Sequence, residues 1–177
     1  TECAPLISFT AADQFKAKSA GAVIPQMEAK IMDADPNTGI GEICVRGENL
    51  MNGYFKNQEA TDSIIDDEGW LHTGDLGMIE ADGTIFIRGR SKSMILGPSG
   101  QNIYPEEIEA KLNNMPFVME SLVVENNGRL HALVYPDYEA VDLEKLDQKQ
   151  LEKVMEENRV ALNNIVASYE SIAKIHL

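Results

Sequence analysis

Residues 72–109 constrain the fold of this chain more than any other stretch, because turn chemistry recurs through them at short intervals. The stretch reads HTGDLGMIEADGTIFIRGRSKSMILGPSGQNIYPEEIE, with a Thr-Gly-Asp sequence, an Asp-Gly pair, a Gly-Arg pair and a loop that has glycine at both ends. Glycine, proline and aspartate at such positions mark turns. This is more ordered turn chemistry than a packing segment requires, so we expect the functional site here.

The segment from Gly69 to Asp75 predicts a carboxylate held at a turn. Its apolar part ends at Thr73-Gly74, so we expect the Asp75 side chain to be presented from a turn rather than from within a strand. A carboxylate in such a place can accept two hydrogen bonds from a vicinal diol, and sugar hydroxyls are the obvious candidates. Alone, however, a Thr-Gly-Asp sequence is more often only a turn.

Two hairpins are predicted after Asp75. Alternating apolar residues on both sides of Asp82-Gly83 are typical of a tight hairpin, which would bring Arg90 back beside Asp75 so that both hold one ligand. Residues 94–104 predict a second hairpin, in which Gly100 adopts a positive φ or lets another molecule pass close to the backbone. Pro105 suits the first position of the helix that follows, and its glutamates favour the positive end of the helix dipole.

The remaining sequence predicts an α+β chain with short strands first and helices later. Before Lys92 we expect a lead-in over residues 1–21, a hairpin and a brief helix. After Lys92 we expect a helix from Pro105 to about Asn114, two strands, one long amphipathic helix and a last strand. The expected strands are 27–32, 41–46, 121–125, 130–135 and 172–177, the brief helix is 58–61, and the stripe of the long helix is Leu143, Leu146, Leu151, Val154, Met155, Ala161, Leu162 and Ile165.

Composition narrows the class of protein. The 177 residues are 44% hydrophobic, enough for a real core, and the formal charge of -14 argues against nonspecific nucleic-acid binding. No window approaches the roughly 18 uninterrupted apolar residues of a membrane-spanning helix, so a cytoplasmic location is expected. Cys3 and Cys44 are expected to be free thiols, and the three histidines stand too far apart in sequence to predict zinc.

The motifs resemble the adenylate-forming superfamily and, within it, the AMP-forming acyl-CoA synthetases of the bacterial long-chain fatty acid type. The matching residues cover nearly the whole chain and are Thr1-Glu2, Gly41 to Gly47, Gly53-Tyr54, Gly69 to Gly77, and Gly89 to Glu109. The resemblance implies that residues 1–90 end the large AMP-binding domain as a β-rich distorted barrel. Residues 91–177 would be the mobile carboxy-terminal domain, truncated before its catalytic lysine.

In enzymes of that type a carboxylate attacks the α-phosphorus of ATP to give an acyl-adenylate and pyrophosphate, and the thiol of coenzyme A then displaces AMP. The resemblance implies magnesium as the counter-charge, with Glu2 as its oxygen ligand and Thr1 in contact with the phosphate. Both residues end the family's Tyr-Gly-x-Thr-Glu motif, of which only these two are present.

The resemblance also assigns the other candidate residues. Asp75 and Arg90 would bind the ribose, Lys92 would be the hinge on which the small domain rotates, and Gly100 would line the pantetheine tunnel. Many relatives carry Asp at the hinge position, so Lys92 is a variant, and an exposed linker lysine is the plainer alternative. For Glu107 and Glu109, capping and solvating the helix is the preferred interpretation.

Two parts of the reaction machinery are expected outside this chain. The phosphate-binding loop would precede Thr1 and the catalytic lysine would follow Leu177, so we expect a fragment that is inactive alone and partners the missing amino-terminal part of the same enzyme. Fatty acid, ATP and coenzyme A would be the ligands, and a peripheral membrane contact of the longer enzyme stays open. The alternatives are an adenylating domain that loads a carrier protein, and a noncatalytic module that binds a nucleotide or a partner.

Overall fold

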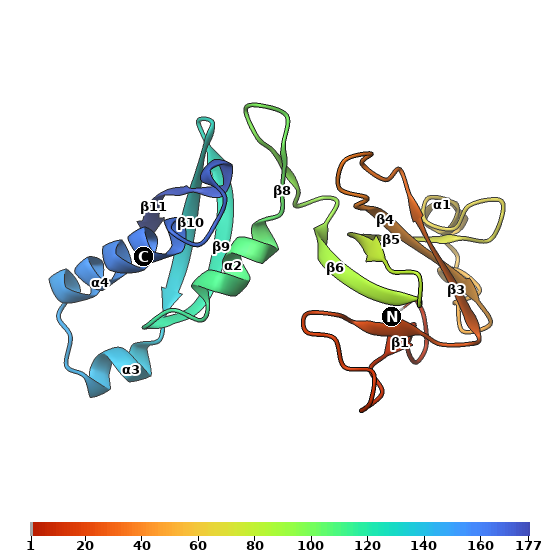
Figure 1. The fold of residues 1–177 in the computed structure, drawn as a ribbon, viewed down its shortest axis with the longest axis horizontal. Helices are drawn as coiled ribbons and strands as arrows, with labels where there is room; N and C mark the ends of the chain where they lie inside the picture. Colours follow the sequence, from red (N-terminus) through yellow and green to blue (C-terminus); the bar gives the residue numbers. More distant parts are fainter. Residues whose placement is uncertain (1) are drawn as a thin grey trace. The chain divides into compact units, whose positions relative to one another are not determined.

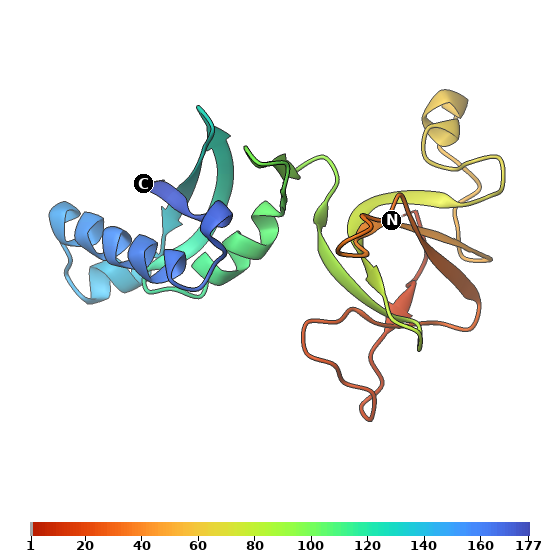
Figure 2. The same cartoon turned by 45° about the horizontal axis from the view of Figure 1, so that its top comes forward.

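The computed structural model describes residues 2–177, which divide into two compact units. The first ends at Lys92 and the second runs from Ser93 to Leu177. Figures 1 and 2 show that each unit has a sheet of its own. The predicted α+β class is confirmed.

The first unit is built on a six-stranded antiparallel sheet with the order β1-β2-β6-β5-β4-β3 (Figure 1). One short helix, α1, accompanies it, and the Asn57 side chain caps that helix by accepting a hydrogen bond from the Ala60 N–H. The elements are β1 Ser8–Phe9, β2 Gly21–Val23, β3 Met27–Met32, β4 Gly41–Gly47, α1 Gln58–Asp62, β5 Leu71–Ile79 and β6 Thr84–Arg90.

Turn chemistry fixes both long hairpins of this sheet. Between β3 and β4, the Asp35 carboxylate accepts hydrogen bonds from the backbone N–H groups of Asn37 and Thr38. Between β5 and β6, Gly83 has a φ of 82° and Asp82 accepts a hydrogen bond from the Thr84 N–H. The predicted hairpin between residues 27 and 46 and the predicted hairpin around Asp82-Gly83 are therefore both confirmed.

The core of the first unit lies under the central strands. Five buried side chains form it, and Trp70 is covered by the cations of Lys30 and Arg46 at 4.1 and 4.4 Å from its ring centre. The five are Met27, Ile43, Val45, Leu71 and Ile85. Apolar residues that alternate along β3, β4 and β6 supply most of this cluster, as the period of a strand requires.

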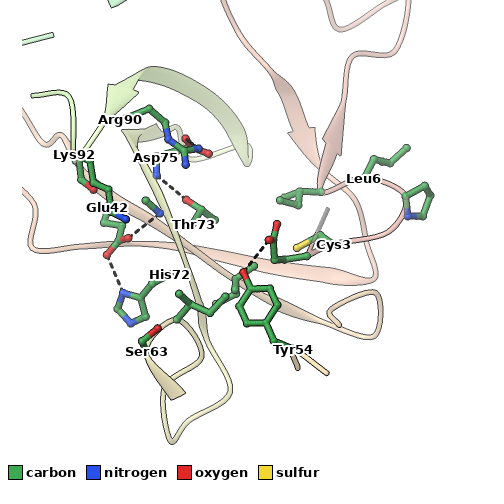
Figure 3. A pocket seen from close by; sticks show the side chains of 17 residues that line it. Cys3, Leu6, Glu42, Tyr54, Ser63, His72, Thr73, Asp75, Arg90 and Lys92 are labelled. Atoms are coloured by element: carbon green, nitrogen blue, oxygen red, sulfur yellow. Dashed lines mark hydrogen bonds and ion pairs between the residues drawn. The ribbon is translucent and has the colours of Figure 1, made fainter. Parts of the chain in front are cut away.

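Asp75 lies inside a strand, so the prediction that a turn presents it is wrong. Strand β5 continues through Thr73, Gly74 and Asp75, and Asp75 pairs with Arg90 of β6 (Figure 3). Gly74 has a φ of 72°, which makes the strand irregular without ending it. Pairing with β4 on one side and β6 on the other keeps the segment in the sheet.

The second unit combines a three-stranded sheet, in the order β11-β10-β9, with a two-stranded hairpin and three α-helices. Strand β10 pairs antiparallel with β9 and parallel with β11. The elements are β7 Ile95–Leu96, β8 Asn102–Ile103, α2 Pro105–Leu112, β9 Val118–Asn126, β10 Arg129–Pro136, α3 Tyr138–Leu143, α4 Gln148–Asn163, the 3-10 helix η1 Ser168–Glu170 and β11 Ile172–His176. The predicted second hairpin, the helix that begins at Pro105 and the last strand are all present.

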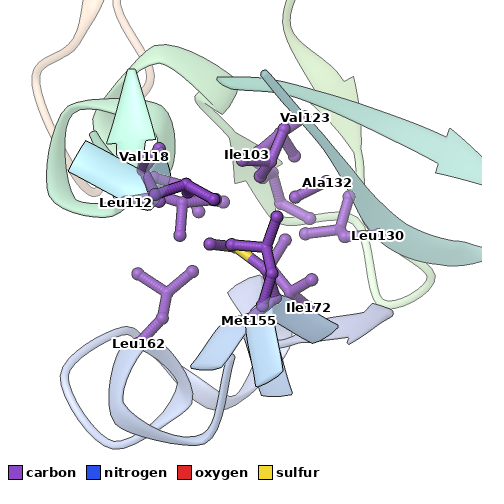
Figure 4. Packing of buried hydrophobic residues seen from close by; sticks show 13 residues of the cluster. Ile103, Leu112, Val118, Val123, Leu130, Ala132, Met155, Leu162 and Ile172 are labelled. Carbon is purple, nitrogen blue, oxygen red and sulfur yellow. The ribbon is translucent and has the colours of Figure 1, made fainter. Parts of the chain in front are cut away.

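Helices α2 and α4 bury their apolar sides against one face of this sheet (Figures 2 and 4). Leu112 of α2 and Leu162 of α4 are fully buried beside Val123 and Ala132 of the strands. Successive residues of β9 and β10 face this core and solvent in turn, so Leu122 and Leu133, next to the buried Val123 and Ala132, are exposed. Both helices therefore contribute buried side chains to the core of the second unit.

The prediction of one long helix after β10 is wrong, because the chain forms α3 and α4 with a break between them. Lys145 has a φ of 55°, and Asp147 forms a capping box with Gln150 that starts a new helix. Leu143, at the end of α3, is consequently 81% exposed, and Ile165, which lies beyond the end of α4, is 60% exposed. Among residues 2–177, no helix has the length and apolar character needed to span a membrane.

Candidate functional site

An open pocket of about 920 Å³ in the first unit contains four of the residues singled out from the sequence. They are Glu2, Asp75, Arg90 and Lys92. Figure 3 shows that the pocket lies between the amino-terminal segment and the ends of β5 and β6. The structure thus places these residues around one space, although they come from positions up to ninety residues apart in sequence.

Asp75 and Arg90 form an ion pair at the edge of this pocket. Arg90 Nη1 donates to Asp75 Oδ1 at 2.6 Å, and the two residues face each other across the β5–β6 ladder. Their side chains are 29% and 59% exposed, so solvent and a ligand can reach them. A carboxylate and a guanidinium in this arrangement can accept from and donate to neighbouring hydroxyl groups of one ligand.

Glu42, a residue that sequence reasoning missed, fixes the strand segment that carries Asp75. Its Oε1 accepts a hydrogen bond from the Gly74 N–H at 2.9 Å, and its Oε2 lies 2.8 Å from His72 Nδ1. Thr73 completes the arrangement, since its hydroxyl donates to the Ile43 carbonyl and accepts from the Asp75 N–H. Its place in the motif from Gly41 to Gly47 was the sequence signal, but its partners depend on the register between β4 and β5, which the sequence does not show.

Glu2 is held at the pocket by Tyr54. The Tyr54 hydroxyl donates to Glu2 Oε1 at 2.9 Å, and the Glu2 carbonyl accepts a hydrogen bond from the Met51 N–H. This Tyr54 hydrogen bond is the main reason that the pKa of the Glu2 carboxyl is lowered, and the same contact raises the pKa of Tyr54. Glu2 is therefore an ionised oxygen donor, as magnesium requires. Thr1, its expected companion, lies outside the described residues.

The structure places the remaining predicted residues as follows. Lys92 is exposed and ends the first unit. Gly100 belongs to the second unit, in the loop between β7 and β8, with a φ of 82° and no atom within 4 Å of where a Cβ would stand. Glu109, expected to act at the helix end, instead accepts a hydrogen bond from the Val123 N–H of β9, and burial raises the pKa of its carboxyl.

Cys3 and Cys44 are free, as predicted, and neither is a candidate nucleophile by its surroundings. Cys44 is fully buried, and burial is the main reason that its pKa is raised to about 11. At neutral pH its sulfur is a protonated thiol. Although His72 lies 3.6 Å from this sulfur, the pair does not meet the requirement of an activated thiolate.

Comparison with known proteins identifies the family. The sequence profile described as "AMP-binding enzyme" matches residues 1–55. The chain is 37% identical over 169 residues to 4-coumarate–CoA ligase-like 1 of Arabidopsis thaliana, covering 91% of this chain and 29% of that protein. It is 47% identical over 114 residues to the long-chain-fatty-acid–CoA ligase of Salmonella typhimurium, covering 62% and 20%. The chain thus spans less than a third of the length of these curated relatives.

Solved structures agree with the sequence matches. O-succinylbenzoate coenzyme A synthetase from Bacillus subtilis in complex with AMP is 29% identical, with a TM-score of 0.72, over 99% of this chain and 35% of that one. A structure of the same enzyme in complex with ATP and a magnesium ion is 30% identical, with a TM-score of 0.67, over 90% and 32%. The structural match to the synthetase bound to AMP covers 99% of this chain, so it includes both units. The chain therefore belongs to the AMP-binding family of adenylate-forming enzymes.

Proposed function

We propose that the enzyme containing this chain activates a carboxylic acid with ATP, as an acyl-adenylate, and transfers the acyl group to coenzyme A. The observation that carries the proposal is the Asp75–Arg90 pair at a pocket that also contains Glu2. Similarity to two acid–CoA ligases and to a synthetase bound to AMP supports it. The match covers 20% of the long-chain relative, and we expect the rest of the enzyme to supply the other residues that the reaction needs.

Different residues of the pocket bind the sugar and the metal ion. Asp75 accepts hydrogen bonds from the ribose hydroxyls, and Arg90 donates to the same sugar while it holds the Asp75 carboxylate in place. Glu2 would hold magnesium, which keeps several waters and takes only one or two carboxylates beside the phosphates. Bound magnesium would neutralise charge on the phosphates during attack by the carboxylate. Tyr54 orients Glu2 for that role.

Transfer to coenzyme A would use the second unit. We propose that the backbone at Lys92 is the hinge and that Gly100 lies along the path of the pantetheine arm. The boundary between the two units, which follows Lys92, supports the hinge. The open space around Gly100 supports close passage of a ligand, because a side chain there would narrow the approach to the backbone.

A long-chain fatty acid is the proposed substrate, with a 4-coumarate-type acid as the second candidate. The long-chain ligase of Salmonella typhimurium has the higher identity, at 47%, but over only 62% of this chain. The 4-coumarate ligase-like relative matches a larger share of the chain, at 37% identity.

Pyrophosphate release by the full-length enzyme tests the proposal. With ATP, magnesium and palmitate we expect release above the blank, and we expect formation of palmitoyl-CoA only when coenzyme A is added. Faster turnover of 4-coumarate would transfer the assignment to the second candidate. Transfer to a carrier protein but not to coenzyme A, or binding of AMP without any pyrophosphate release, would reject the ligase. The 177-residue chain alone is expected to release none.

A further inference from the structure

A cluster of side chains that can ligate a metal lies at the edge of the pocket, and its members do not contact the reacting groups of the proposed reaction. Cys44 of β4 and His72 of β5 are direct partners across the antiparallel ladder, and Glu42 precedes Cys44 by two residues. The Cys44 sulfur lies 3.6 Å from His72 Nδ1, and that same nitrogen lies 2.8 Å from Glu42 Oε2. The three donor atoms all lie within 4.8 Å of one another.

These separations are close to those that a tetrahedral transition metal imposes on its ligands. With zinc–sulfur and zinc–nitrogen bonds of normal length, the sulfur and nitrogen ligands stand about 3.6 Å apart. The observed Cys44–His72 separation has this value. Imidazole nitrogen and carboxylate oxygen would stand about 3.3 Å apart, so the Glu42 oxygen needs to retreat from His72 by about half an ångström.

A second shell is already in place around these donors. Asp66 Oδ2 lies 3.7 Å from the other ring nitrogen of His72, and backbone N–H groups of Glu68 and Trp70 hold the Asp66 carboxylate. A carboxylate behind a histidine is the arrangement that orients imidazole ligands toward a metal. The second oxygen of Glu42 is occupied by the Gly74 N–H, which leaves Oε2 for the ion.

The donor set selects the class of ion, and the pocket provides access. Cysteine sulfur with imidazole nitrogen favours zinc over magnesium or calcium, which take oxygen ligands. Cys44 is fully buried, whereas Glu42 and His72 both line the pocket, so an ion would reach the sulfur from that side. On binding, the ion would displace the proton of the Cys44 thiol into water, so that the sulfur coordinates as a thiolate. Water from the same pocket would complete the coordination.

We propose that Glu42, Cys44 and His72 bind one transition-metal ion of the zinc class. The ion ties β4 to β5 immediately before the Asp75 segment and is separate from the magnesium proposed at Glu2. Its binding therefore stabilises the first unit. Neither the binding nor its consequence depends on the ligase reaction.

Cobalt(II) titration of the metal-free 177-residue chain tests the site, because cobalt replaces zinc and reports a thiolate ligand by its sulfur-to-metal charge-transfer absorption. We expect one equivalent to produce this band together with the visible bands of tetrahedral cobalt, and zinc to remove both. Cys44→Ser should abolish the charge-transfer band. Cys3→Ser, which removes the other thiol of the chain, should leave it unchanged.

Two further variants keep the test decisive if Cys44→Ser does not fold, as judged by circular dichroism. His72→Gln and Glu42→Gln should each weaken cobalt binding about tenfold or more. Absence of the charge-transfer band in the wild-type chain would overturn the proposal. So would a band that survives Cys44→Ser, or unchanged affinity in both the His72 and the Glu42 variants.

Discussion

At the scale of single residues, the pocket depends on side chains that are far apart in sequence. The proximity of Asp75 and Arg90 was predictable, because an Asp-Gly hairpin between them fixes the return of the chain. The contribution of Glu42 was not, because it reaches Gly74 and His72 through a strand pairing that bridges some thirty residues. A local pattern specifies a hairpin, but it does not specify which distant strand lies beside it.

Removing the Glu42 side chain should impair nucleotide use by loosening the Asp75 segment. In the full-length enzyme we expect Glu42→Ala to lower kcat/KM for ATP about tenfold or more, since the half-buried Gly74 N–H loses a charged acceptor. Glu42→Gln keeps an oxygen for the Gly74 N–H and should recover part of the loss. Glu28→Gln, which alters an exposed pair with Arg46, is the matched control. Equal losses in the Gln and Ala variants would contradict a positioning role.

At the scale of elements, short-range signals located most of the strands but misjudged where the amphipathic region breaks. The apolar periodicity continued through residues 144–147, whereas the cap at Asp147 and the positive φ of Lys145 end one helix and begin another. Similarly, the glycine at position 74 suggested the end of a strand, yet the neighbouring strands hold it in the sheet. Tertiary pairing overrode the local preference in that case.

The cap of α4 can be tested directly. Asp147→Ala removes the acceptor for the Gln150 N–H and should lower the free energy of unfolding by about 1 kcal/mol. Urea titration followed by circular dichroism measures this change. Lys149→Ala, an exposed substitution in the same turn, should stay within about 0.5 kcal/mol of the wild type. A similar loss in both variants would show that capping does not set the start of α4.

Glu109 makes the stability of the second unit depend on pH in a defined direction. Because burial raises its pKa in the folded state, the folded state binds its proton more tightly than the unfolded state does. This contribution to stability is fully present below the ordinary value of 4.5 and is lost as pH rises through the raised folded value. Glu109→Gln keeps an acceptor for the Val123 N–H and removes the charge.

We therefore expect Glu109→Gln to raise the thermal midpoint relative to the wild type at neutral pH, and to lose this advantage as the pH falls below 4.5. Melting curves across that range measure the difference. Glu107→Gln, on the same helix turn, serves as the comparison. An advantage for Glu109→Gln that grew toward acid pH would have the opposite sign to the one derived from burial.

At the scale of the whole molecule, two hydrophobic clusters define two units, each with its own sheet. Membership of the family followed from motifs that are dense between residues 69 and 109. The acyl substrate does not follow from them, because a 4-coumarate–CoA ligase-like protein and a long-chain-fatty-acid–CoA ligase are both similar to this chain. The structure adds the register between strands, and with it the side-chain clusters that span distant parts of the sequence.

Because each unit has its own hydrophobic cluster, we expect a destabilising substitution in one unit to leave the unfolding of the other unit unchanged. Leu162→Ala should destabilise the second unit by about 2 to 5 kcal/mol, because it leaves a cavity at a fully buried position. Helices α2 to α4 belong to that unit, whereas Trp70, the one tryptophan of the chain, belongs to the first. Helical circular dichroism should therefore melt earlier while tryptophan fluorescence keeps its midpoint. Equal shifts in both signals would indicate a single cooperative unit.

The most direct test of the nucleotide site compares ATP with 2′,3′-dideoxy-ATP in the full-length enzyme, with and without Asp75→Asn, by calorimetry. If Asp75 holds the ribose diol, the wild type should bind the dideoxy nucleotide about tenfold to a hundredfold more weakly than ATP. The Asp75→Asn variant should bind both nucleotides weakly and with similar affinity. A wild type that does not discriminate, or a variant that discriminates as well as the wild type, would contradict the assignment of this pocket.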